Sequence, residues 1–144
     1  MSMFPSIGVS GSGLVVDSAW LDALAGNISN SNDYTTPGKP VFRPQEVVVA
    51  PQAESNVAVP GSQAASDALG VAVQSVQYSG NPQGVLKYDP QNPLSNAAGM
   101  IAYPDVSIGH ELVSLVDAQT SFQANANALQ NSSDAYKAIL NIKS

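Results

Sequence analysis

Apolar residues near the N-terminus recur at helical spacing. The large apolar side chains between positions 14 and 30 include Leu14, Leu21, Leu24 and Ile28, with Ala19 and Ala25 beside them. Three of these lie seven residues apart, which is typical of an amphipathic helix with a narrow apolar face. Gly11 and Gly13 predict a flexible entry to this helix, and the segment 27–33, NISNSND, predicts its end.

A second, longer helix is predicted after Pro104. Two series of positions with a spacing of seven run through residues 107–142. The first series is Ile108, Leu115, Phe122, Leu129 and Tyr136, and the second is Leu112, Gln119, Ala126, Ser133 and Leu140. This is coiled-coil spacing, although small and polar residues weaken the second series. Glu111 lies in the first turn, where a carboxylate offsets the positive end of a helix.

The segment 34–104 has the character of strands and turns. It holds nine of the ten prolines, which excludes long helices there. Short β-rich runs predict strands at 46–50, 70–78 and 85–88. Residues 79–84, SGNPQG, predict the turn before the last strand. Within 70–78 the alternation places Val71 and Val73 on one face.

These elements predict an α+β fold in three parts. The parts are an N-terminal helical segment (1–33), a β-rich middle region (34–104) with a loop at 51–69, and a long C-terminal helix (105–144). The shared spacing of seven predicts that the terminal helices pair as a coiled coil, antiparallel or staggered. Two arrangements stay open: a helical hairpin that closes over a small sheet, or helices that pair with each other and then with copies in other subunits.

Composition favours the second arrangement. Charged residues make up only 11% of the chain, and residues 121–130, SFQANANALQ, carry no charge. A helix without charges can be buried on several sides because no ion has to leave water. The net charge of −6 and the five scattered basic residues disfavour nucleic acid as a partner.

The sequence contains no arrangement typical of catalysis or of metal binding. His110 is the single histidine, so a catalytic triad would have to use it, but its place beside Glu111 in the first turn of a helix favours a surface residue. There is no cysteine, which excludes a thiolate nucleophile, and one histidine with scattered carboxylates gives no metal-ligand spacing. The glycine-rich segment 8–13 lacks the lysine of a phosphate-binding loop. We therefore expect no enzyme activity, no catalytic residues, no cofactor and no metal.

The N-terminal residues lack a basic segment followed by an unbroken apolar run, so they do not predict a secretory signal peptide. No apolar run approaches the ~20 residues of a transmembrane helix, so we expect no direct membrane insertion.

Four segments together match the motifs of one protein family. They are LDALAGNISN (21–30), KPVFRPQEVVV (39–49), LKYDPQNPLSNAAGMIAYPDV (86–106) and SFQANANALQ (121–130). In this order and spacing the chain resembles the flagellar basal-body rod proteins, and most closely those of the proximal rod. The chain departs from the family pattern at Ser29, Met100 and Thr120. Thr120 stands where an arginine is often found, so an ion pair between subunits at that place is in doubt.

The resemblance implies a structural subunit of the proximal rod of the bacterial flagellum. Such a subunit self-assembles by helix packing, transmits motor torque, and is exported by the type III apparatus to a rod that spans the periplasm, without a cleaved signal peptide. The implied partners are copies of the chain, other rod proteins and the export apparatus. The alternative is a soluble adaptor module whose long helix docks one partner protein.

Two sets of residues are assigned from the helical pattern and from the resemblance. The expected subunit-packing residues are Leu14, Leu21, Leu24, Ile28, Leu112, Leu115, Phe122, Leu129, Tyr136 and Leu140. The residues that match the family motifs are Asn27, Asn30, Tyr88, Asp89, Pro90, Pro93, Gln123 and Asn125.

Overall fold

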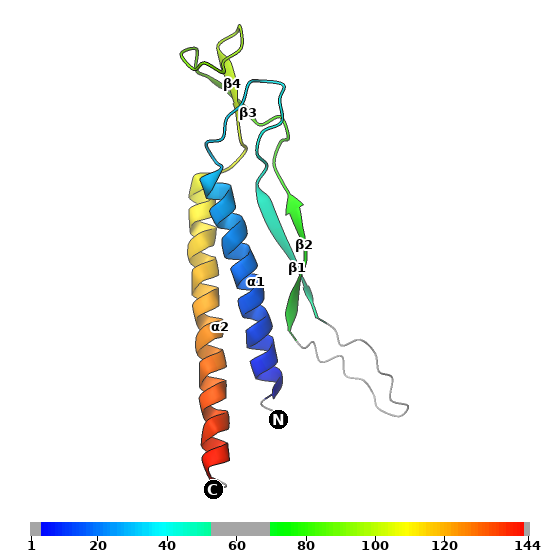
Figure 1. The fold of residues 1–144 in the computed structure, drawn as a ribbon, viewed down its shortest axis with the longest axis vertical. Coiled ribbons are helices and arrows are strands. Elements are labelled where there is room, and N and C mark those ends of the chain that lie inside the picture. The colour runs from blue at the N-terminus through cyan, green and yellow to red at the C-terminus, as the bar shows by residue number, and fades with distance from the viewer. Residues whose placement is uncertain (1–3, 53–69, 143–144) are drawn as a thin grey trace, which may run out of the picture.

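The computed structural model describes residues 4–52 and 70–142 as an elongated molecule built on two antiparallel helices (Figure 1). The elements are, in order, α1 (Phe4–Ser29), β1 (Gln45–Pro51), β2 (Val71–Tyr78), β3 (Val85–Tyr88), β4 (Met100–Tyr103) and α2 (Ile108–Ile142). The α+β fold with paired terminal helices is thus confirmed. Within the described ranges, neither helix is long and apolar enough to cross a membrane.

Helix α1 begins at Phe4 rather than near Leu14, where the apolar pattern starts. The prediction of a flexible entry at Gly11 and Gly13 is wrong, because both glycines lie inside the 26-residue helix. Tertiary contacts offset their poor helix propensity in this stretch. The backbone N–H of Val71 donates to Ser12 Oγ at 3.1 Å, which ties α1 to the start of β2.

Helix α2 spans 35 residues and agrees closely with the predicted range. Its first turn follows Ser107, whose carbonyl accepts from the Glu111 N–H at 2.9 Å. At ~1.5 Å per residue α2 is about 52 Å long and α1 about 39 Å. The C-terminal turns of α2 therefore extend past the N-terminal end of α1 (Figure 1).

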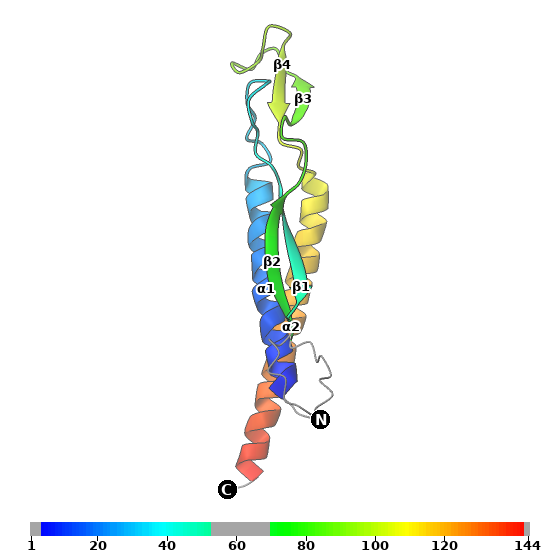
Figure 2. The ribbon, with the colours of Figure 1, turned by 90° about the vertical axis from the view of Figure 1, so that its right-hand side faces the viewer.

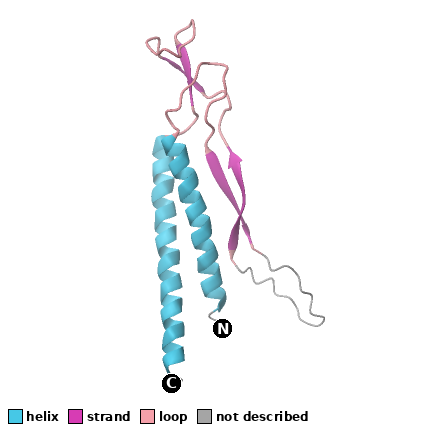
Figure 3. Cartoon of the chain, viewed as in Figure 1, coloured by secondary structure: helices cyan, strands magenta, loops and turns pink. Residues whose placement is uncertain are grey.

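The middle region forms two separate antiparallel hairpins. β1 and β2 lie alongside α1, whereas β3 and β4 lie beyond the end of the helix pair (Figures 2 and 3). The three predicted strands are confirmed, and β4 was missed. The pairing of β1 with β2 shifts between Val48 and Val49, so the predicted alternation of β2 is interrupted at Gln74.

The ends of the first hairpin are closed by backbone contacts. Pro51 still belongs to β1, although it was assigned to the loop 51–69, and the Gln52 N–H donates to the Gly70 carbonyl at 2.9 Å. The rest of that predicted loop, residues 53–69, lies outside the described residues.

The predicted turn at 79–84 is present and ends at Gly84, whose φ of 69° is a conformation that glycine adopts readily.

The apolar core of the described residues is small and divided between two places. Ala23, Leu24 and Ala118 are buried in the helix pair, and Val41, Ile101 and Ala102 are buried where β4 meets residues 35–41. Many larger apolar side chains remain exposed, so the described part of the chain covers little of its own apolar surface.

Candidate assembly interface

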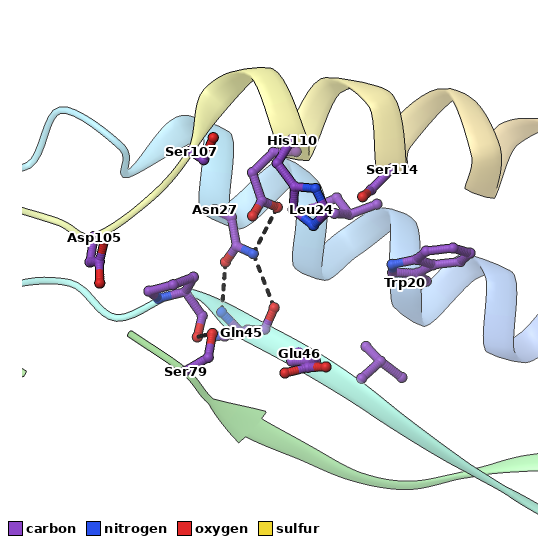
Figure 4. Close-up of a pocket in the computed structure, with 13 residues that line it drawn as sticks. Trp20, Leu24, Asn27, Gln45, Glu46, Ser79, Asp105, Ser107, His110 and Ser114 are labelled. Atoms are coloured by element: carbon purple, nitrogen blue, oxygen red, sulfur yellow. Dashed lines mark hydrogen bonds between the residues drawn. The ribbon is translucent and has the colours of Figure 1, made fainter. Parts of the chain in front are cut away.

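Asn27 joins three elements at the upper end of the helix pair. Its Nδ2 donates to the Gln45 carbonyl and to Glu111 Oε2, both at 3.0 Å, and its Oδ1 accepts from the Gln45 N–H at 2.7 Å (Figure 4). The side chain is only 2% exposed. One amide therefore fixes where β1 leaves α1 and where α2 begins.

Asn27 was expected as a motif residue, but its two partners were missed. Glu111 is 8% exposed and binds Asn27, in addition to lying in the first turn of α2. Gln45 contributes only backbone atoms to this contact, so its side chain gave no signal. Glu111 is one of the few charged residues of α2, and this was the signal that could have identified it as a partner of a buried polar group.

A second polar contact joins the helices lower down. Asn125 Nδ2 donates to Asp17 Oδ2 at 2.8 Å, and Asp17 is 5% exposed. Gly13 lies against the same amide, because a Cβ at Gly13 would be 2.7 Å from Asn125 Nδ2. The absence of a side chain at Gly13 thus lets Asn125 approach α1.

The face of α2 that meets α1 is small and polar. Glu111 and Asn125 bond to α1, and Ala118, midway between them, is fully buried. Positions seven apart lie close to the same face of a helix, since seven residues make almost two turns. Along this line α2 therefore directs a carboxylate, a small side chain and an amide toward α1.

Near the start of α2, the face opposite to α1 is apolar and exposed. Leu112, Val113 and Val116 are 49%, 62% and 59% exposed. At ~100° per residue they lie between about 120° and 220° around the helix from Ala118. We call these three residues the outer ridge of α2.

The expected subunit-packing residues divide between the two sides of the helix pair. Leu24 is buried, and the half-buried members are Leu14, Leu21, Ile28, Leu115 and Leu129. The remaining four are exposed, namely Leu112, Phe122, Tyr136 and Leu140. The first group is at least partly covered within the chain, and the second leaves apolar surface exposed.

The motif residues do not form one site. Asn27 and Asn125 bind across the helix pair, whereas Asn30 bonds within its own helix end, to the Gly26 carbonyl at 2.8 Å. The tract around Tyr88 lies in the distant β3–β4 hairpin, and the Tyr88 side chain is 68% exposed. Asp89 is half-buried, and the exposed motif residues are Pro90, Pro93 and Gln123.

A pocket of about 440 Å³ lies between α1, β1 and the start of α2 (Figure 4). His110 and Ser114 line it, but the described residues show no hydrogen bond from His110 to a serine or carboxylate. No group of three metal-binding side chains occurs in residues 4–52 and 70–142.

Comparisons with known proteins agree with this arrangement. A family model described as "Flagellar basal body rod FlgEFG protein C-terminal" matches residues 97–142, which include β4 and α2. Flagellar basal-body rod protein FlgC of Salmonella typhimurium is 32% identical over 129 residues, 90% of this chain and 89% of the relative. FlgC of Bacillus subtilis is 29% identical over 90% of each chain. FlgC of Borreliella burgdorferi is 27% identical over 99% of this chain and 98% of the relative.

A helix pair that leaves large apolar residues exposed on its outside offers surface for packing against other subunits. The chain belongs to the FlgC family of flagellar basal-body rod proteins, and it is a structural subunit of the rod of the bacterial flagellar basal body.

Proposed function

We propose that this chain assembles into the proximal rod by packing its helices against copies of itself and against other rod proteins. In this role it transmits motor torque and catalyses no reaction. The outer ridge of α2 carries the proposal, because it is an apolar surface that the described part of the chain leaves uncovered.

Burial of the outer ridge provides a driving force for assembly. Each Å² of apolar surface removed from water stabilises association by roughly 25 cal/mol. The helices also carry few charges that would have to be desolvated: Asp17 and Asp22 in α1, and Glu111, Asp117, Asp134 and Lys137 in α2. Lateral packing of such helices costs little in ion desolvation.

The elongated shape suits transmission of torque. Both helices run along the long axis of the molecule (Figure 1). A layer of laterally packed helices resists twisting because every side-chain contact between neighbours would have to shift together. The three parts of the chain, 1–33, 34–104 and 105–144, would then serve different purposes, with the helical ends forming the layer and the middle region lying outside it.

Localisation and export complete the proposal. We place the chain in the part of the rod that spans the periplasm, reached through the type III export apparatus without a cleaved signal peptide. Family membership supports this placement. Comparison of the intracellular and basal-body forms by mass spectrometry tests it, since an unprocessed N-terminus is expected in both.

The assembly role is tested by swimming in a strain that lacks the native protein. The double variant Leu112→Ser, Val116→Ser makes the outer ridge polar, and Gln119→Ser, Thr120→Ser is a matched control on exposed polar positions of the same helix. We expect the first variant to be exported yet absent from purified basal bodies, and the control to restore swimming. Normal swimming by the ridge variant would contradict the proposal.

A further inference from the structure

A narrow apolar slot opens between α1 and β1. Val16 and Trp20, one turn apart on α1, lie opposite Val47 and Val49, which are alternate residues of β1. With Asp17 they line a cavity of about 290 Å³. We call this cavity the α1–β1 slot.

The slot has no occupant in the described part of the chain. Alternate residues of a strand share a face, so Val47 and Val49 both point toward the helix. Val47 is half-buried there, but Val49 is still 48% exposed. Helix and strand therefore leave a gap at Val49.

We propose that the outer ridge of α2 from a second copy of this chain fills the α1–β1 slot. This contact deepens the proposed assembly function and rests on it. In this contact two surfaces meet. The outer ridge of one copy consists of Leu112, Val113 and Val116, and the slot of the next copy is lined by Val16, Trp20, Val47 and Val49.

Charge supports a second copy as the occupant. The chain carries a net charge of −6, so contact between two copies is least unfavourable where both surfaces are uncharged. The ridge contains no charged residue, and neighbouring Glu111 is buried against Asn27. The one charged residue of the slot, Asp17, already accepts a hydrogen bond from Asn125. Ridge and slot therefore match as uncharged apolar surfaces.

Continuity with the existing helix interface supports the same occupant. Asp17 belongs both to the slot and to the contact between α1 and α2. An α2 helix placed in the slot would lie on α1 beside the α2 of its own chain, and would extend one layer of helices from subunit to subunit. Ridge and slot are different surfaces, so the contact is heterologous and each added copy leaves one of each free.

The ridge and the slot lie at different heights along the helices, so neighbouring copies that join them are offset along the helix axis. The ridge lies one to five residues beyond Glu111, which meets Asn27 at the upper end of α1, and so roughly 2–8 Å below that end at ~1.5 Å per residue. Val16 and Trp20 lie seven to eleven residues before Asn27, which is roughly 10–17 Å below the same end. Successive copies are therefore offset by roughly 9 Å along the axis.

Disulfide cross-linking tests the contact, because the chain has no cysteine of its own. The double variant Val49→Cys, Val113→Cys is expressed in a strain without the native protein, and purified basal bodies are oxidised. We expect dimers and higher multimers on a non-reducing gel. The matched control, Val15→Cys with Val113→Cys, uses an α1 residue that is 67% exposed but does not line the slot. It should give no multimers.

The outcomes separate this contact from the assembly function itself. If the double variant is present in basal bodies without Val49–Val113 multimers, the contact is wrong and the assembly function stands. Dimers from Val113→Cys alone, or a cross-link from position 49 to a different rod protein, would likewise overturn it. Normal swimming by the ridge variant Leu112→Ser, Val116→Ser would instead count against the assembly function.

A charge pair provides a second test that does not depend on disulfide geometry. Val113→Asp alone and Val49→Lys alone each place a charge in an apolar contact, and we expect a roughly tenfold loss of chain from basal bodies. Together the two charges attract, so the double variant should recover to within about twofold of the unmodified chain. Equal loss in the double variant and the single variants would overturn the contact.

Discussion

Asn125 donates a hydrogen bond of 2.8 Å to Asp17, although 108 residues separate the two in the sequence. Asp17 is only 5% exposed, and the bond crosses the interface of α1 and α2. A buried polar pair of this kind accepts one alignment of the helices, because a shift by one turn leaves both groups without a partner. Together with Asn27 and Glu111, it fixes how far α2 extends past α1.

Loss of the Asn125 amide should destabilise the helix pair. Asn125→Ala leaves the Asp17 carboxylate buried without its donor, and we expect a cost of about 1–3 kcal/mol in free energy of unfolding. The control Gln123→Ala removes an exposed amide two residues away and should cost less than ~0.5 kcal/mol. Urea unfolding followed by circular dichroism, at a concentration where the helices are formed, measures both. Equal urea midpoints for Asn125→Ala and Gln123→Ala would show that the bond between Asn125 and Asp17 contributes nothing to stability.

Replacing Gly11 and Gly13 of α1 by alanine should change the free energy of unfolding in opposite directions. A Cβ at Gly11 would meet no neighbouring group within 4 Å, so Gly11→Ala should stabilise the helix by roughly 0.5–1 kcal/mol. Gly13→Ala places a Cβ 2.7 Å from Asn125 Nδ2, so the amide must shift and its hydrogen bond to Asp17 is disturbed. We expect Gly13→Ala to destabilise the chain in the same urea experiment.

A double variant separates the clash from any intrinsic effect at position 13. In an Asn125→Ala background the clashing amide is absent, so adding Gly13→Ala should become stabilising. If Gly13→Ala costs the same in both backgrounds, the close approach of Asn125 is not its cause.

A carboxylate at position 27 should be poorly tolerated unless Glu111 is also changed. Asn27→Asp removes the donor that serves Glu111 and Gln45, and it sets two carboxylates at a hydrogen-bond distance of about 3.0 Å. We expect a cost of more than about 2 kcal/mol, because a buried charge loses its donor and gains a like charge. Adding Glu111→Gln supplies an amide donor and should restore most of the stability. No recovery in the double variant would contradict the proposed contact.

The isolated chain should gain order with concentration. Its described core holds few large buried side chains, and the outer ridge of α2 stays exposed without a neighbour. Association that buries this ridge stabilises the folded state by mass action. Amide exchange in α2 should therefore be fast in dilute protein and slow in the assembled form. Slow exchange throughout residues 108–140 in a verified monomer would show that the helix pair is stable alone.

The two ends of α1 show where reasoning from sequence succeeded and failed. The end near Ser29 was predicted from helix-disfavouring residues that follow it. The start was missed because Gly11 and Gly13 weaken a helix locally, whereas contacts to Val71 and Asn125 hold that stretch. Strand β4 was missed because four residues, MIAY, give too little alternation to separate a strand from a loop.

The sequence by itself determined the order of the two helices and of three of the four strands, the long α2 and the family. It did so because periodicity depends on neighbours a few residues apart, and because the motif segments are contiguous. The tertiary structure alone decided which face of α2 turns inward. A spacing of seven shows which residues share a face, but Ala118 and Leu112 lie on different faces, and the larger apolar residue is the exposed one. The inward face follows from the bonds of Asn27 to Glu111 and of Asp17 to Asn125, whose partners lie 84 and 108 residues apart and meet only when the chain folds.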